Sequence, residues 1–105
     1  MKSNICTEIA EFRVISDMSE ERFLSIVEQL ERNFHSKQSG FISTMLAKGN
    51  EQSEWIMVQQ WDSAEQAHEA SKKMMKETIT EDFRSALDPR SVKIRYLPCF
   101  LSITK

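Results

Sequence analysis

Trp61 and His68 carry the functional groups of this sequence that could most directly bind and act on a small molecule. Indole offers a large flat surface and one N–H donor. Imidazole, with an ordinary pKa of about 6.5, can remove or relay a proton near neutral pH. A strand is predicted to end at Trp61, and a helix that begins near Ser63 carries His68 more than one turn along. We therefore expect Trp61 to stack on a substrate and His68 to act as the catalytic base or as a hydrogen-bond partner. The alternatives are that Trp61 packs in the core and that His68 is a partly exposed helix residue.

Small and flexible side chains accompany this pair. The apolar stripe of the same predicted helix consists of Ala64, Ala67, Ala70 and Met74. Such small residues either bring a helix close to the sheet or leave room for a flat ligand. Met57 could belong to an adaptable pocket, although methionine is also a common core residue. Tyr96, on the last predicted strand, could meet a phenolate or a carboxylate of a ligand.

Several kinds of chemistry lack their usual residues. The chain has two glycines, too few for a loop that cradles phosphates, and it contains no HExxH motif, nucleophile elbow or dinucleotide fingerprint. Cys6 and Cys99 have no second ligand about two to four residues away, so no metal site is expected. They could lie near each other on neighbouring strands, but we expect no disulfide in a reducing compartment. We predict that the protein needs no cofactor.

The hydrophobic pattern predicts the elements that would position these residues. Strands are expected over residues 7–15, 41–48, 55–61 and 92–103, and helices from Asp17 or Ser19 to Phe34, over 63–76, and around Phe83. This βαββαβ order is that of a ferredoxin-like α+β fold, with strand order 4-1-3-2 and helices on one face of an antiparallel sheet. Pro98 favours an edge position for the last strand. His35 follows the first helix, where the helix dipole favours a cation, and is interpreted as structural.

The third strand has two apolar faces. Trp55, Met57 and Trp61 point one way along it, whereas Ile56 and Val58 point the other way. Because the helices cover only one face, the other would leave an apolar patch in water, which monomers avoid. We therefore predict a homodimer in which the sheets face each other. A lone domain with scattered exposed apolar residues is the alternative.

Composition limits the remaining possibilities. A chain of 105 residues forms one domain, residues 1–105, and its 14 basic and 16 acidic residues give a net charge of −2 without a basic stripe. Nucleic acid is therefore not an expected partner. No apolar run approaches the roughly 18 residues of a membrane span, and the N-terminus lacks a signal-peptide core. We predict a cytoplasmic protein that does not insert into membranes.

Two short motifs resemble those of the antibiotic biosynthesis monooxygenase family. The first is Ser39-Gly40-Phe41 at the start of the second strand, and the second, W-x-S-x-E-x-A, is formed by Trp61, Ser63, Glu65 and Ala67. Together with the element order, the resemblance covers nearly the whole chain. It implies a dimeric α+β barrel with a hydrophobic cavity between sheet and helices. It also implies oxidation of polycyclic phenols to quinones by O₂ without metal or flavin.

The resemblance matches Trp61 to the tryptophan that ends the third strand in the family. Met57 stands where a polar residue is expected, and Ala67 where a tyrosine is expected. The leading hypothesis is a cofactor-independent monooxygenase for a small aromatic, phenolic or quinone-type molecule, with His68 catalytic. Its substrate-binding residues would be Trp61, Met57, Ala67 and Tyr96. The alternatives are a non-catalytic barrel that binds a hydrophobic metabolite and a haem-binding or haem-degrading relative.

Overall fold

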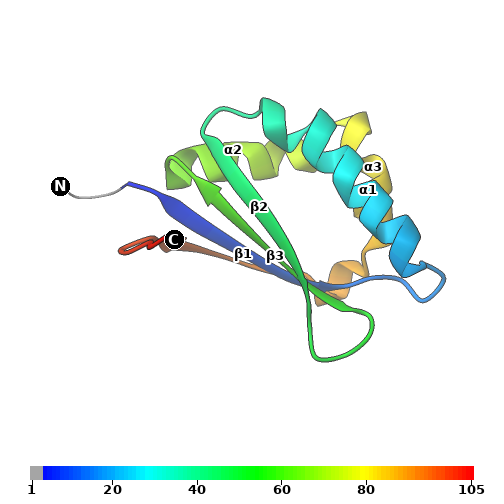
Figure 1. Ribbon diagram of the computed structural model, residues 1–105. Coiled ribbons are helices and arrows are strands. Elements are labelled where there is room, and N and C mark those ends of the chain that lie inside the picture. Colours follow the sequence, from blue (N-terminus) through cyan, green and yellow to red (C-terminus); the bar gives the residue numbers. More distant parts are fainter. Residues whose placement is uncertain (1–3) are drawn as a thin grey trace.

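Within residues 4–105, which the computed structural model describes, four antiparallel strands form one sheet (Figure 1). The strands are β1 (Cys6–Arg13), β2 (Phe41–Lys48), β3 (Glu54–Trp61) and β4 (Lys93–Pro98). Their order across the sheet is β2-β3-β1-β4, which confirms the predicted ferredoxin-like topology with the last strand at an edge.

The helices lie on one face of this sheet (Figure 1). They are α1 (Glu20–Asn33), α2 (Ala64–Met74) and α3 (Glu81–Ala86), joined to their neighbours by the 3₁₀ turns η1 (His35–Lys37), η2 (Thr78–Thr80) and η3 (Pro89–Ser91). Serine hydroxyls cap the two longer helices. Ser19 accepts a hydrogen bond from the backbone N–H of Arg22, and Ser63 accepts one from that of Gln66. Of the two caps predicted for the first helix, Ser19 is therefore the one that forms.

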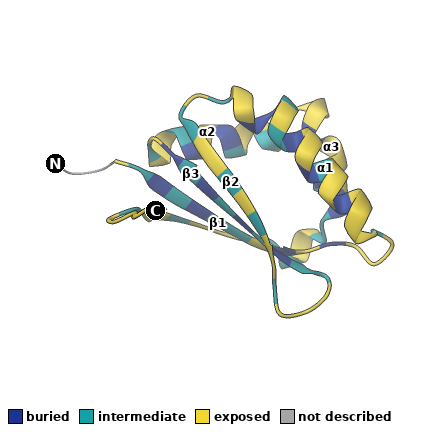
Figure 2. Cartoon of the chain, in the orientation of Figure 1, coloured by how far each residue is buried: buried dark blue, intermediate teal, exposed yellow. Residues whose placement is uncertain are grey.

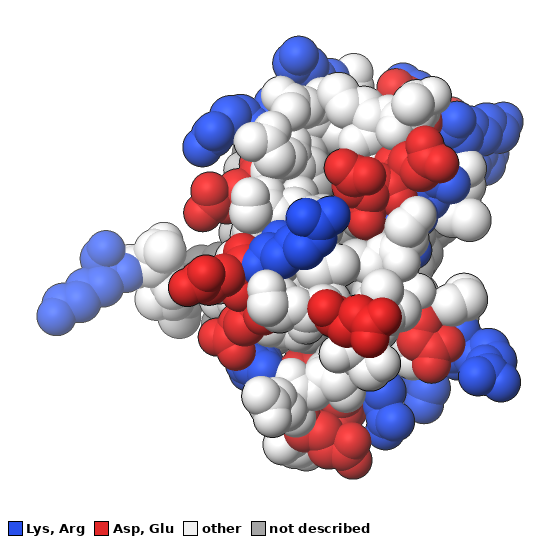
Figure 3. All heavy atoms as spheres, turned by 90° about the vertical axis from the view of Figure 1, so that its right-hand side faces the viewer, with Lys and Arg blue, Asp and Glu red and all other residues white. Residues whose placement is uncertain are grey.

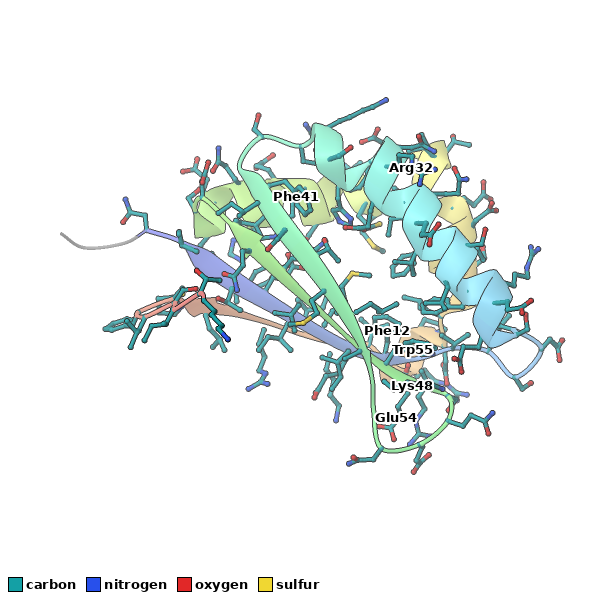
Figure 4. All side chains as sticks on the ribbon, viewed as in Figure 1. Phe12, Arg32, Phe41, Lys48, Glu54 and Trp55 are labelled. Atoms are coloured by element: carbon teal, nitrogen blue, oxygen red, sulfur yellow. The ribbon has the colours of Figure 1, made fainter. Side chains whose placement is uncertain are left out.

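An aromatic cluster joins α1 to the sheet. The ring of Phe23 lies edge-on to Phe12 with centroids 6.0 Å apart and is tilted against Trp55 at 5.1 Å. Phe12 and Trp55 are cross-strand partners, and in Figure 4 they lie at the end of the sheet that α1 approaches. This packing closes one end of the space between sheet and helices. Figure 2 shows the buried surfaces of the helices turned toward the sheet.

The last strand is shorter than predicted. β4 ends at Pro98, whereas a strand was expected as far as residue 103. Proline has no backbone N–H and cannot continue the ladder, and after it the N–H of Cys99 donates to the carbonyl of Ile5 over 2.9 Å. Beyond it the large apolar side chains Phe100, Leu101 and Ile103 are exposed. Cys99 and the buried Cys6 are both free thiols.

The face of the sheet away from the helices is bare (Figure 1). As predicted, Trp55, Met57 and Trp61 are buried beneath the helices, while the alternate residues Ile56 and Val58 are only partly buried on the other face. On the molecular side drawn in Figure 3, Lys and Arg side chains are intermixed with Asp and Glu. No extended basic patch covers that side.

Candidate ligand cavity

A cavity of about 430 Å³ lies between the sheet and the helices α2 and α3. Most of its wall is apolar, and it is built from β1, β3, α2, α3 and the segment that leads into β4. Three of the lining residues, Met75, Pro89 and Ile94, are exposed, so the cavity opens beside the edge strand β4. Hollows of about 490 to 530 Å³ elsewhere are lined largely by polar and charged surface residues. The apolar cavity is the one suited to an organic ligand.

One end of this cavity is polar. Glu8, Gln59 and His35 line it and are buried. Glu8 on β1 is the cross-strand partner of Gln59 on β3. Trp61 follows Gln59 by two residues on β3, so it faces the same side of the sheet and is the diagonal neighbour of Glu8. Within the described chain, Oε1 of Glu8 and Nε1 of Trp61 are buried and neither reaches full hydrogen-bond geometry. The indole N–H nevertheless lies close enough to stabilise the charged form of the Glu8 carboxyl, so the two groups are partners of each other.

The buried environment raises the pKa of the Glu8 carboxyl. Burial raises its pKa above the ordinary value of 4.5, because the charged form loses its hydration. The positive charge of His35 and the indole N–H of Trp61 act in the opposite direction, yet the net shift remains upward. Glu8 is therefore a carboxylate that binds a proton more tightly than an exposed one. This is the property expected of a general base or a hydrogen-bonding group in an apolar site.

A hydrogen-bonded chain holds His35 at the same end of the cavity. Its Nδ1 lies 2.6 Å from Oε2 of Glu31, while Oε1 of Glu31 accepts a hydrogen bond from the hydroxyl of Thr44. The amide nitrogen of Gln59 in turn donates to that hydroxyl oxygen over 3.1 Å.

Aromatic rings fix the imidazole further. His35 stacks on Phe41 with centroids 5.9 Å apart and lies edge-on to Trp61 at 6.1 Å. Figure 4 shows Phe41 and Phe12 toward opposite ends of the sheet, so the polar end of the cavity is opposite the aromatic cluster.

The predicted site residues occupy different places. Trp61 and Met57 line the cavity. Ala67 is fully buried, but in a small cluster with Cys6 and Trp61 rather than in the cavity wall. Tyr96 packs against this cluster, and burial raises its pKa, an effect that its hydrogen bond with Ser71 opposes.

His68 lies outside the cavity. Its side chain is exposed on α2, and its ring meets Tyr96 edge-on with centroids 4.1 Å apart. The nearest link to the cavity runs through Tyr96, whose hydroxyl lies 2.7 Å from Oγ of Ser71, a lining residue. The geometry gives His68 no direct contact with a ligand there.

The polar side chains Glu8, His35, Gln59, Ser71 and Arg84 of the lining were not recognised as site residues from the sequence. Glu8 is in phase with Ala10 and Phe12 along β1, so strict alternation from Phe12 could have placed it inward. His35, interpreted as a structural helix-terminal residue, instead lines the cavity. Its burial in η1 depends on ring contacts with Phe41 and Trp61, which are distant in the sequence and leave no local signal.

Two absences hold for the part of the chain that is described. Residues 4–105 contain no group of three or more His, Cys, Asp or Glu side chains arranged to hold a metal ion. No helix among them is long and apolar enough to cross a membrane.

Comparison with known proteins places this geometry in context. Residues 5–88 match the family described as "Antibiotic biosynthesis monooxygenase". No curated protein sequence matches the chain.

Solved structures share the fold at low sequence identity. A mutant of SnoaB, a cofactor-independent oxygenase from Streptomyces nogalater, superimposes with a TM-score of 0.76 at 12% identity, over 98% of this chain and 100% of that chain. A dimeric ferredoxin-like protein from an uncultured marine organism gives 0.65 at 13% identity, over 98% and 94% of the two chains. The Mycobacterium tuberculosis protein Rv0793 gives 0.68 at 14% identity, over 95% and 99%. At these identities the likeness establishes the fold alone.

Proposed function

The chain belongs to the antibiotic biosynthesis monooxygenase family, and we propose that it is a cofactor-independent monooxygenase acting on a small aromatic, phenolic or quinone-type molecule. The observation that carries the proposal is the 430 Å³ apolar cavity with buried ionisable groups at one end. Its apolar wall suits a flat hydrocarbon framework, with Trp61 and Met57 as contact residues. SnoaB, which has the same fold, is a cofactor-independent oxygenase and provides a precedent.

The reaction that fits this proposal uses O₂ as the oxidant. A ring CH₂ group becomes a carbonyl when one oxygen atom enters the substrate and the other leaves as water with the two hydrogens. The protein would bind the aromatic framework, accept a proton and stabilise the anion that reacts with O₂. An apolar cavity supports these steps because electrostatic interactions are stronger where water is excluded.

A binding protein without activity is the alternative function, and the cavity distinguishes the two. A barrel that only stores a hydrophobic metabolite needs no ionisable group inside. Glu8 and His35 both line this cavity and are buried. Because burying an ionisable group costs free energy, their presence favours the catalytic proposal.

Oxygen consumption tests this function directly. We expect the wild-type protein to consume O₂ with an anthrone-type substrate and to form the corresponding quinone. Val92→Trp, which fills the cavity near β4, should abolish turnover, whereas Ile79→Trp, at an exposed residue of the 3₁₀ turn η2, should preserve it. Equal turnover in both variants would place the reaction outside the cavity. No turnover in the wild type, together with tight anthrone binding, would favour the storage alternative.

We also propose that the protein forms a homodimer through the bare face of the sheet. Ile9, Val58 and Met45 are consecutive cross-strand neighbours on that face, and Met45 is 61% exposed. Leu97 on β4, the cross-strand partner of Thr7, is on the same face and is also exposed. A contact between two such faces would remove the apolar patch from water. The dimeric ferredoxin-like protein noted above has the same fold and provides a precedent.

A further inference from the structure

The imidazole of His35 lies at the polar end of the cavity and is held there by the carboxylate of Glu31. We propose that His35 is the general base of the reaction, that its Nε2 atom takes a proton from the ring CH₂ group of the substrate, and that Glu31 positions it. This inference rests on the proposed function and identifies the residue that accepts the proton.

The hydrogen bond to Glu31 determines which ring nitrogen of His35 is able to act. Nδ1 lies 2.6 Å from Oε2 of Glu31, and it carries the hydrogen because an ionised carboxylate only accepts. The neutral ring therefore has its lone pair on Nε2. His35 lines the cavity and is 3% exposed, so the ring borders the cavity rather than bulk water. Nε2 is thus the atom of this ring that can accept a proton from a bound ligand.

Aromatic contacts fix the orientation of the imidazole. The ring stacks on Phe41 and packs edge-on against Phe34, with centroids 5.9 Å and 5.0 Å apart. It also lies edge-on to Trp61, a lining residue, at 6.1 Å. A base held in this way needs little reorganisation to meet a substrate that lies on Trp61.

Two carboxylates stabilise the imidazolium that forms when His35 accepts a proton. Glu31 of α1 acts through the hydrogen bond to Nδ1, and Glu8 of β1 interacts electrostatically with His35. Arg84 of α3 also lines the cavity, but it donates to the hydroxyl of Thr80 and the carbonyl of Glu77. The positive charge on His35 is therefore offset from two sides.

Glu8 is the other buried group of the cavity that could accept a proton. Its carboxylate interacts with the indole N–H of Trp61, which stabilises the charged form and weakens it as a base. His35 has instead the carboxylate–imidazole arrangement in which a carboxylate at one ring nitrogen supports proton gain at the other. This difference assigns the role to His35.

The step is a proton transfer and needs no oxidant. One C–H bond of the CH₂ group breaks, the proton bonds to Nε2, and the electron pair stays on the substrate, delocalised onto its ring carbonyl as an enolate. The imidazolium becomes neutral again when its Nδ1 hydrogen moves to Oε2 of Glu31. The side chain of Glu31 is 22% exposed, so the proton can pass from there to water.

Hydrogen exchange in anthrone tests the proton transfer separately from oxidation. In D₂O without O₂, a base exchanges the two hydrogens of the anthrone CH₂ group for deuterium. We expect the wild-type protein to accelerate this exchange over the rate in buffer, and to consume O₂ once it is admitted. His35→Gln should lower both rates about 100-fold, a usual contribution of a general base. Glu8→Gln should cause a smaller loss, and the reverse order would contradict the assignment to His35.

Glu31→Gln tests the positioning of the ring. The side-chain NH₂ group of the variant can donate to Nδ1, which places the hydrogen of the neutral ring on Nε2 and blocks that atom. We expect kcat to fall about tenfold or more while KM changes less than about twofold. Glu28→Gln, at an exposed residue of the same helix, should retain both values.

Nitrogen NMR of the wild-type protein examines the tautomer without a variant of the site. The chain has two histidines, and His68→Gln identifies the signals that belong to His35. At pH 8 we expect a neutral His35 ring with its hydrogen on Nδ1. A hydrogen on Nε2, or an imidazolium at this pH, would contradict the inference even if His35→Gln does not fold.

The possible outcomes separate this inference from the proposed function. Equal rates of anthrone oxidation by the wild type and His35→Gln would contradict the role of His35 and leave the monooxygenase proposal intact. Exchange that depends on His35 but occurs without O₂ consumption would support the base and contradict the monooxygenase. If the wild-type protein neither exchanges nor oxidises anthrone, both proposals are wrong.

Discussion

Nδ1 of His35 lies 2.6 Å from Oε2 of Glu31, four residues earlier in the chain. A carboxylate oxygen can only accept, so Nδ1 carries the hydrogen, and a neutral His35 has its lone pair on Nε2. Glu31 also accepts a hydrogen bond from Thr44 on β2, and it therefore connects α1 and η1 to the sheet. This carboxylate fixes both the position and the tautomer of a histidine that lines the cavity.

Replacing Glu31 should consequently reduce stability. In Glu31→Gln the side-chain amide presents one oxygen and one NH₂ group to two donors, so one of the two hydrogen bonds is lost. We expect the free energy of unfolding to fall by about 1–2 kcal/mol, as for a partly buried hydrogen bond to a charged group. Urea denaturation measures the change. Glu28→Gln is the matched control, because Glu28 is exposed on the same helix and should change stability by less than about 0.5 kcal/mol. Equal effects of the two substitutions would contradict the connecting role of Glu31.

The raised pKa of Glu8 predicts how stability depends on pH. A carboxyl whose pKa is higher in the folded state contributes stability below its ordinary pKa of 4.5, and this contribution is lost as the pH rises through the folded-state value. Glutamine does not titrate. The stability of the wild type relative to Glu8→Gln should therefore decrease above pH 4.5, with a limiting slope of about 1.4 kcal/mol per pH unit.

Urea unfolding of both proteins between pH 4 and pH 8 measures this difference. The difference should level off once the pH exceeds the folded-state pKa. A difference that is constant, or that increases with pH, would mean that Glu8 is not destabilised in its charged form.

Much of the fold follows from local sequence signals, as the start of β2 illustrates. Gly40 has a φ of 82°, a left-handed conformation that glycine adopts without steric cost, and β2 begins at the next residue as predicted. The cap at Ser63 likewise marks the start of α2 one residue later. The end of β4 was mispredicted because apolar residues continue past Pro98. The strand ends at this proline because it has no N–H to donate to the ladder.

The cavity was harder to predict because it depends on tertiary packing. A charged residue in a strand is expected to face water, and for this reason Glu8 was not recognised as a lining residue. In the structure it is buried beside its cross-strand partner Gln59. The direction of His68 was also not specified by the sequence. This residue directly follows Ala67, and one residue corresponds to a rotation of about 100° around a helix, which turns His68 away from the buried face. Proximity to Trp61 in the sequence did not specify that direction.

The outward direction of the His68 side chain gives a test of this residue as the catalytic base. Because its exposed ring contacts Tyr96 rather than the cavity, we expect His68→Ala to change the affinity for anthrone and the rate of anthrone oxidation by less than about twofold. Stopped-flow oxygen consumption and calorimetry measure these quantities, with His35→Gln as the comparison. A loss of about tenfold or more in turnover, with unchanged affinity, would instead support the assignment of His68 as base.

The bare sheet face predicts a dimer that a single charge can disrupt. Val58 lies between Ile9 and Met45 on that face, and Val58→Lys would bury a lysine without a partner if two sheets meet there. Sedimentation equilibrium at micromolar concentration should give twice the chain mass of 12.3 kDa for the wild type and the chain mass for the variant. Ile79→Lys introduces the same charge at an exposed apolar residue of η2, on the helical side, and should remain dimeric. A monomeric wild type would contradict the dimer. If both variants remain dimeric, the contact lies elsewhere on the molecule, and the exposed residues of the sheet face need another explanation.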